Sequence, residues 1–404
     1  MFTSLAHFIN DGTTFTMPLI IALLTTEKIV SSLTIVLMPV VFYSGSLLLG
    51  VVVAALAERS ERPGLLVGTG LGVSAAGLFG IAASLSYETS LGRGVGVLLS
   101  SFVVGLGTGF YHPIGGAILQ ADYGDRVRGK ALGINGALGA VGRALYPSLF
   151  FAIAAAATDY RSIASLAAIG AVGCIAVSIG LMGHPSLSSR GRLEGPEGSG
   201  GLRSHLTKPL LILAIVAFVS AFGVQGVTTW MPTYLALQKG LGVTSSLGFA
   251  LTGMYAAAVV GQPFFGYLVD RFEKRMVLAL SIGGSAVSIL CYLFSSGVLD
   301  AVLLVVLGFF TFSSFPLFLS LTADYVPRRS SSLSNALVWT LGVNGGGVVG
   351  PAVLGAVVLS GAASWPVAFE MMAAIALVAT AMVALLRRPT PALNASPDGQ
   401  VGDS

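Results

Sequence analysis

The sequence predicts an all-α membrane protein with twelve transmembrane helices in two pseudo-symmetric bundles of six. Three observations predict this fold class: the residue composition, a series of twelve apolar segments, and a resemblance between the two halves of the chain. Apolar residues make up 54% of the 404 residues and charged residues only 9%, whereas soluble domains carry roughly 25% charged residues. This composition lacks the polar side chains that a water-facing surface needs.

Twelve apolar segments are long enough to cross a bilayer, which takes about 20 residues in a helix. Short polar or charged loops separate them. We place the spans at 2–24, 33–57, 64–84, 95–120, 130–157, 161–183, 209–237, 245–269, 275–295, 299–325, 331–360 and 365–387.

The distribution of basic residues predicts the orientation of these spans, because Lys and Arg favour cytoplasmic loops. With the amino terminus inside, 16 of the 21 Lys and Arg residues fall in inner loops or in the tail, four fall in outer loops, and Arg143 lies inside a span. The pattern therefore predicts an integral protein with both termini in the cytoplasm. The expected location is the plasma membrane, or the inner membrane of a cell that has two.

One long polar segment divides the chain. Residues 184–208 are rich in Gly, Ser and charge, which is typical of a flexible linker. This cytoplasmic linker separates an N-terminal six-helix bundle, 1–183, from a C-terminal one, 209–388. The tail 389–404 is polar and contains proline, so we expect it to be disordered.

The two halves resemble each other at corresponding places. The sequence AALAERSERPGLL follows the second span and GYLVDRFEKRMVL follows the eighth. The fifth and eleventh spans are both rich in glycine and carry a late proline, Pro147 and Pro351. Such parallel repeats place the substrate between the halves, near the middle of the membrane.

The loop after the eighth span resembles the loop signature of the major facilitator superfamily, G-x-L-x-D-R-x-G-R-R. The copy after the second span departs from it, with Glu58 in place of Asp and Glu61 where Gly is usual. The resemblance implies the major facilitator fold. It also implies that Glu58, Arg59, Asp270 and Arg271 form a conformational latch at helix ends. The alternative is that these short charged loops only mark the cytoplasmic side.

Two further motifs resemble the fosmidomycin-resistance branch of that superfamily. They are HFIND at residues 7–11 and GLGTGFYHP at residues 105–113. The resemblance covers roughly the first 150 residues and implies proton-linked export of a small solute, without naming the cargo.

Three ionisable residues inside the spans are candidates for proton coupling: His7, Asp11 and His112. Ionisable groups at this depth are costly and mark functional sites. His7 and Asp11 lie one helical turn apart and share a face. A carboxylate in a partly dry cavity binds protons more readily, and histidine exchanges them near neutral pH. Alternatively, Asp11 braces local backbone and His112 belongs to a helix break at Pro113.

Arg143 interrupts a run of glycines in the fifth span. A buried guanidinium needs an anion, which is either Asp11 or an anionic substrate. We therefore predict a role in substrate binding, with a fixed brace to Asp11 as the alternative. Tyr111, Gln225 and Asn344 are further candidates for substrate binding, and for each the alternative is packing or hydrogen bonding between helices.

The predicted function is secondary active transport by alternating access, as proton-coupled antiport that exports a drug-like or anionic compound. One alternative is a proton symporter or facilitator for an organic anion, and another is a sensor or scaffold without transport. Coupling to sodium stays open. The sequence carries no nucleotide-hydrolysis, hydrolase or metal-ligand motif, so we expect no enzyme activity, cofactor, metal or nucleic-acid partner. The expected partners of this monomer are lipid, protons and a small molecule.

Overall fold

The computed structural model describes residues 1–123, 125–156, 159–184, 207–325, 334 and 337–387. All regular structure in these residues is helical. Among these residues, twelve helical spans are long and apolar enough to cross a membrane. The predicted fold class is therefore confirmed.

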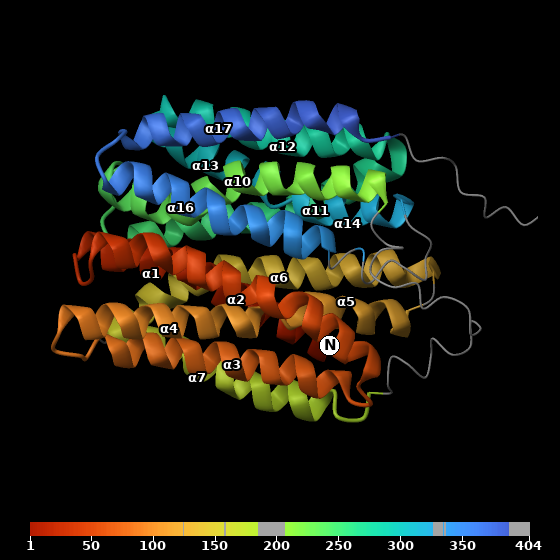
Figure 1. Cartoon of the computed structure of the whole chain (residues 1–404), viewed down its shortest axis with the longest axis horizontal. Helices are drawn as coiled ribbons and strands as arrows, with labels where there is room; N and C mark the ends of the chain where they lie inside the picture. The colour runs from red at the N-terminus through yellow and green to blue at the C-terminus, as the bar shows by residue number, and fades with distance from the viewer. Residues whose placement is uncertain (124, 157–158, 185–206, 326–333, 335–336, 388–404) are drawn as a thin grey trace, which may run out of the picture.

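The helices form two layers in Figure 1. The lower layer, red to yellow, contains α1 (Phe2–Thr26), α2 (Ser32–Arg59), α3 (Pro63–Ser84), α4 (Ser90–Thr108), α5 (Tyr111–Asp122), α6 (Asp125–Ala154) and α7 (Asp159–Gly180). The upper layer, green to blue, contains α10 (Lys208–Leu237), α11 (Ser245–Arg271), α12 (Lys274–Leu293), α13 (Val298–Thr311), α14 (Ser314–Tyr325), η3 (Val338–Asn344), α16 (Gly345–Leu359), α17 (Trp365–Met382) and η4 (Val383–Leu385). We call these layers the N-half and the C-half.

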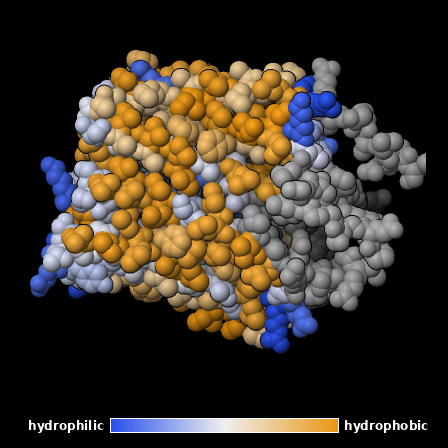
Figure 2. Space-filling model, viewed as in Figure 1, coloured by the Kyte–Doolittle hydropathy of each residue, from blue (hydrophilic) through white to orange (hydrophobic). Residues whose placement is uncertain are grey.

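The surface of the bundle has the polarity of a membrane protein. Figure 2 shows apolar residues across the middle of the molecule and hydrophilic residues at its two ends. We call the end where α1 begins, on the right in Figure 1, the amino end, and the opposite one the far end. The apolar band matches the lipid core of a bilayer.

The fourth and tenth spans are each broken into two helices, where the sequence predicted continuous segments. The breaks separate α4 from α5 and α13 from α14. Pro113 and Pro316 follow the two breaks, and a proline cannot donate to the carbonyl four residues earlier. The freed carbonyl of Phe312 accepts a hydrogen bond from Gln262 Nε2 at 3.2 Å. Matching breaks in both halves fit a structural repeat.

The described part of the eleventh span contains a π-helix, Val338–Asn344, which continues as α16. Single π-helical turns are rare and occur frequently at functional sites. This one faces the N-half, because η3 packs against α2 as well as α10.

Among the described residues, the halves contact each other through α1 with α10, α2 with both η3 and α16, and α6 with α11. The predicted linker lies outside the described residues except at 184, 207 and 208, and the tail 389–404 lies wholly outside them. The side chains of Glu58 and Arg59 are also outside the described set.

Candidate functional site

Glycines let α6 approach α1 closely enough to bring a buried charge beside it. A Cβ atom on Gly142 would lie 2.0 Å from the backbone oxygen of Phe8, and one on Gly139 would lie 2.5 Å from the ring of His7. Both contacts are shorter than side chains tolerate. The predicted glycine run therefore serves as a contact face, and Arg143 follows directly on it.

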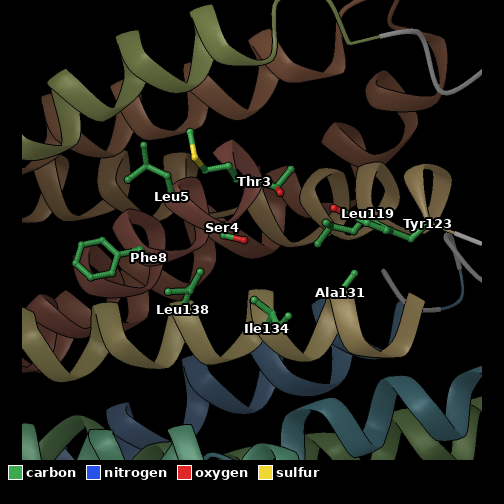
Figure 3. A pocket seen from close by; sticks show the side chains of 10 residues that line it. Thr3, Ser4, Leu5, Phe8, Leu119, Tyr123, Ala131, Ile134 and Leu138 are labelled. Carbon is green, nitrogen blue, oxygen red and sulfur yellow. The ribbon is translucent and has the colours of Figure 1, made fainter. Parts of the chain in front are cut away.

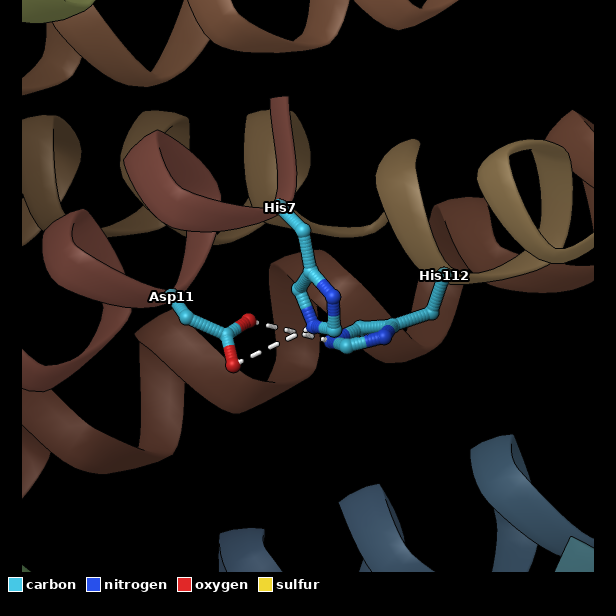
Figure 4. Close-up of side chains that lie close together, drawn as sticks. All are labelled: His7, Asp11 and His112. Atoms are coloured by element: carbon cyan, nitrogen blue, oxygen red, sulfur yellow. Dashed lines mark ion pairs between the residues drawn. The ribbon is translucent and has the colours of Figure 1, made fainter. Parts of the chain in front are cut away.

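Three cationic or protonatable side chains converge on the Asp11 carboxylate. His7 Nε2 lies 3.3 Å and Arg143 Nη1 lies 3.7 Å from Asp11 Oδ2, and His112 Nε2 lies 3.6 Å from Oδ1. Asp11 is 4% and Arg143 5% exposed. Figure 4 shows both imidazoles pointing at the carboxylate from α1 and α5. The structure thus brings together all four ionisable residues predicted for coupling and substrate binding.

Hydrogen bonds fix the ring of His7. Its Nδ1 lies 2.8 Å from the backbone oxygen of Asn135, and because a carbonyl only accepts, Nδ1 carries a hydrogen. Nε2 faces a carboxylate oxygen, and two lone pairs there would repel, so this atom also suits a proton. The side-chain nitrogen of Asn135 lies 3.0 Å from Nδ1. A protonated Nδ1 needs an acceptor there, which the Asn135 side chain provides when its amide is turned so that the oxygen faces the ring. At the contact between Nε2 and Asp11, a further proton is therefore held either by Nε2 or by the facing carboxylate oxygen of Asp11.

Tyr111 supports this arrangement from α5. Its hydroxyl donates to the backbone oxygen of Thr3 at 3.0 Å and contacts the Asn135 side chain. Its ring stacks on His7 with centroids 4.7 Å apart. The sequence predicted Tyr111 as a substrate contact. In the structure its side chain is 2% exposed, and its contacts with Thr3, Asn135 and His7 place it as a residue that orients His7.

Trp339 covers His112 from the other half of the molecule. The two ring centroids are 4.9 Å apart, and Trp339 belongs to the π-helix. Sequence reasoning missed both Trp339 and Asn135. A signal was present, since each lies twelve residues before the late proline of its Gly-rich span, at corresponding positions of the repeat.

Aromatic rings from both halves surround the guanidinium of Arg143. Its Cζ lies 5.3 Å from the ring centroid of Phe15 and 5.2 Å from that of Phe312. Arg143 Nε is buried and has no hydrogen-bond partner among the described residues. A buried unpaired donor is costly, so this nitrogen marks a place where an acceptor is missing.

The cluster also has the donor atoms of a metal site, which sequence reasoning did not expect. One ligand atom each from His7, Asp11 and His112 lie within 4.8 Å of one another. Such a set suits a transition-metal ion. However, the guanidinium of Arg143 contacts the same carboxylate, and its positive charge disfavours a divalent cation there.

Two other predicted substrate residues bridge helices. Gln225 donates to the backbone oxygen of Val343 at 3.0 Å, and Asn344 donates to the hydroxyl of Ser46 at 3.2 Å. The Asn344 bond crosses between the halves.

The structure describes the side chains of two of the four predicted latch residues, Asp270 and Arg271. Both are exposed. The guanidinium of Arg271 lies 4.7 Å from the ring centroid of Tyr267. The neighbouring cation makes the firmer link, since Lys274 Nζ lies 2.7 Å from Asp324 Oδ1. That ion pair joins the start of α12 to the end of α14.

A cavity of about 620 Å³ lies at the amino end, among α1, α5 and α6. Figure 3 shows its lining, which is mostly apolar and includes Phe8, Leu119 and Leu138. None of the predicted site residues lines it. None of its described lining residues has a charged side chain to recognise a solute, so the buried cluster around Asp11 is the better candidate site.

Comparisons with known proteins agree with this architecture. The chain is 25% identical over 355 residues to the fosmidomycin resistance protein of Escherichia coli (strain K12), covering 87% of this chain and 84% of that protein. It is 24% identical over 315 residues to the putative niacin/nicotinamide transporter of Bacillus subtilis (strain 168), covering 74% of this chain and 77% of the relative. The fold matches a solved nucleoside transporter with a TM-score of 0.72 at 14% identity, covering 96% of this chain and 98% of that one.

The family model of the Major Facilitator Superfamily matches residues 3–253 and 237–402. These ranges cover nearly the whole chain. The likeness to transporters extends through both halves, and the twelve apolar spans fit it. The chain therefore belongs to the Major Facilitator Superfamily, as an integral membrane transporter of small solutes and not an enzyme.

Proposed function

We propose that this protein carries a small organic anion across the membrane together with protons. The observation that carries the proposal is the buried pair of Arg143 and Asp11, 3.7 Å apart, with Arg143 Nε unpaired. With a protonated His7 the cluster has a net positive charge, which suits an anion. The compounds in the names of the two relatives support it in part, since niacin is a carboxylic acid and fosmidomycin a phosphonate, whereas nicotinamide, also named for the first relative, is neutral.

The pair of Arg143 and Asp11 also supports a direction of coupling, in which protons and cargo move the same way across the membrane. A proton on Asp11 weakens its attraction for Arg143 and frees the guanidinium for a carboxylate or phosphonate. A proton at Asp11 and an anion at Arg143 therefore favour each other's binding, and such coupling is reciprocal. Ligands that bind together cross together when the halves rock. Proton symport of an anion thus has the stronger physical argument.

Proton-coupled antiport is the second candidate. It is favoured by the likeness to the fosmidomycin resistance protein over most of both chains, because export of an antibiotic produces resistance. Antiport requires cargo and protons to compete for one site, and Asp11 would supply that site for a neutral or cationic compound. Coupling through Asp11, His7 and His112 is common to both candidates.

The proposed orientation has both termini in the cytoplasm. The excess of Lys and Arg at the inner loops supports it. We also propose that the protein works as a monomer in the plasma membrane, because each half already has its partner within the chain.

The direction of coupling can be tested in liposomes that contain the purified protein and a pH-sensitive dye. Niacin and fosmidomycin serve as probe anions, added outside with no pH gradient. We expect entry of the anion to acidify the lumen, and Arg143→Gln to abolish that signal. Empty liposomes control for passive entry of the neutral acid. Alkalinisation of the lumen would establish antiport instead. An equal signal from Arg143→Gln would exclude the anion site.

A further inference from the structure

We propose that the transported anion has a flat aromatic body, held between Phe15 of the N-half and Phe312 of the C-half, with its charge on Arg143 and the Tyr255 hydroxyl. The proposal rests on the proposed function, because it assumes that the cargo is an anion bound at Arg143. It adds the chemical class of the cargo and two side chains that recognise it.

Two buried donors without acceptors belong to side chains that contact the same pair of rings. Arg143 Nε and the Tyr255 hydroxyl both lack hydrogen-bond partners among the described residues, and the two residues are 5% and 0% exposed. The ring centroids of Phe15 and Phe312 lie 5.3 and 5.2 Å from Cζ of Arg143. The same rings lie 5.1 and 5.4 Å from the ring of Tyr255. One carboxylate has two oxygens, enough to accept from both donors.

The rings around these donors favour a flat aromatic cargo over an aliphatic one. Phe15, Phe312 and Tyr255 contact one another edge to face, with centroids 5.1 to 5.4 Å apart. This arrangement is the preferred one for aromatic pairs, and an added ring extends it. An aliphatic acid of similar size would fill the same space without these contacts.

The cluster is divided between the halves, which explains how a ligand enters. Phe15 and Arg143 belong to α1 and α6, while Tyr255 belongs to α11 and Phe312 follows α13. The rings meet in the arrangement described, and they separate when one half rotates against the other. A flat ring can then enter between Phe15 and Phe312, and closure of the halves around it completes the occluded state.

The test compares three compounds of similar size by calorimetry on the purified full chain in detergent: benzoate, cyclohexanecarboxylate and benzamide. They separate charge from flatness. We expect benzoate to bind about three- to tenfold tighter than cyclohexanecarboxylate, and benzamide to bind far more weakly than benzoate. Tyr255→Phe removes only the hydroxyl, and we expect benzoate affinity to fall by about tenfold or more, as for loss of a hydrogen bond to a charged group.

Two phenylalanine variants complete the test. Phe312→Leu should abolish the preference for benzoate while both carboxylates still bind. Phe249 lies on α11 but is 70% exposed, so Phe249→Leu is the matched control and should leave the preference unchanged. Equal affinity for the two carboxylates, lost in Arg143→Gln, would overturn the aromatic class and leave the anion proposal standing. Carboxylate binding that survives Arg143→Gln would overturn both.

Discussion

At the scale of single residues, Asp11 controls the charge of the site. His7, His112 and Arg143 all lie within 3.7 Å of its two carboxylate oxygens, so protonation of this one group changes three electrostatic contacts at once. In the proposed coupling, the proton binds to this one carboxylate and the anion binds to Arg143, so no second acidic residue is needed. We therefore expect the coupling to depend on Asp11 more than on either histidine.

The substitution Asp11→Asn should separate coupling from translocation. An amide keeps the size of the side chain but cannot carry a proton in exchange, and it leaves Arg143 permanently free for an anion. We expect gradient-driven accumulation of the anion in liposomes to be lost, while exchange of labelled for unlabelled anion across the membrane continues.

Asp122→Asn is the matched control, because Asp122 lies outside the site and pairs with His184 at 2.9 Å. It should accumulate the anion like the unaltered protein. Loss of both accumulation and exchange in a folded Asp11→Asn protein would contradict a coupling role and make Asp11 a structural partner of Arg143.

The ionisable centre of the site could be predicted from the sequence, and its surroundings could not. Charged residues inside apolar spans are rare enough for His7, Asp11, His112 and Arg143 to stand out. Trp339 escaped notice because an aromatic residue in a span more often packs or lies at the interface. Only the folded helices reveal that it covers His112.

At the scale of the helices, the contact of α6 with α1 determines where Arg143 lies. A Cβ atom on Gly142 would meet the backbone oxygen of Phe8 at 2.0 Å, and backbone atoms cannot turn aside as a flexible side chain can. Gly142→Ala should force α6 away from α1. Overpacking of this kind costs about 1–3 kcal/mol, so we expect a lower thermal midpoint in detergent and weaker anion binding.

Gly133→Ala is the control for this prediction. Gly133 lies on the same helix, is exposed, and has no atom within 4 Å of where its Cβ would be. Alanine there should leave the thermal midpoint unchanged or slightly higher, because alanine favours a helix over glycine. Equal stability of the two variants would show that the close approach at Gly142 is not needed.

The number of helices followed from hydropathy, but their interruptions did not. Hydropathy measures which residues prefer lipid, and the fourth and tenth spans stay apolar enough across their breaks to be found as single spans. The prolines were visible, yet a proline in a transmembrane helix often produces only a kink because neighbouring groups satisfy the freed carbonyl. The π-helix at Val338–Asn344 packs against α2 of the other half, a contact that no local sequence pattern predicts.

At the scale of the whole molecule, the two halves are in contact near the far end. The hydroxyls of Ser148 and Thr252 lie 2.7 Å apart, and Thr252 also donates to the backbone oxygen of Ala144 at 2.6 Å. A Cβ atom on Gly248 would lie 2.6 Å from the ring of Phe151. These contacts join α6 to α11. Alternating access requires them to separate once in each cycle.

A disulfide between these helices should therefore stop transport. We would combine Ser148→Cys and Thr252→Cys in a protein in which both native cysteines, Cys174 and Cys291, are replaced by serine. Oxidation should abolish transport in liposomes and a reductant should restore it, because the bond holds the far end closed. The control protein keeps native Cys174, has only Cys291 replaced by serine, and carries Gly72→Cys, whose Cβ would lie 3.7 Å from that of Cys174, a distance suited to a disulfide. That bond joins α3 to α7 within one half and should leave transport intact.

The contrary outcome is continued transport by the oxidised protein with cysteines in place of Ser148 and Thr252, with the bond confirmed by mass spectrometry. It would mean that the far end stays closed and that cargo follows a path other than the one between the halves.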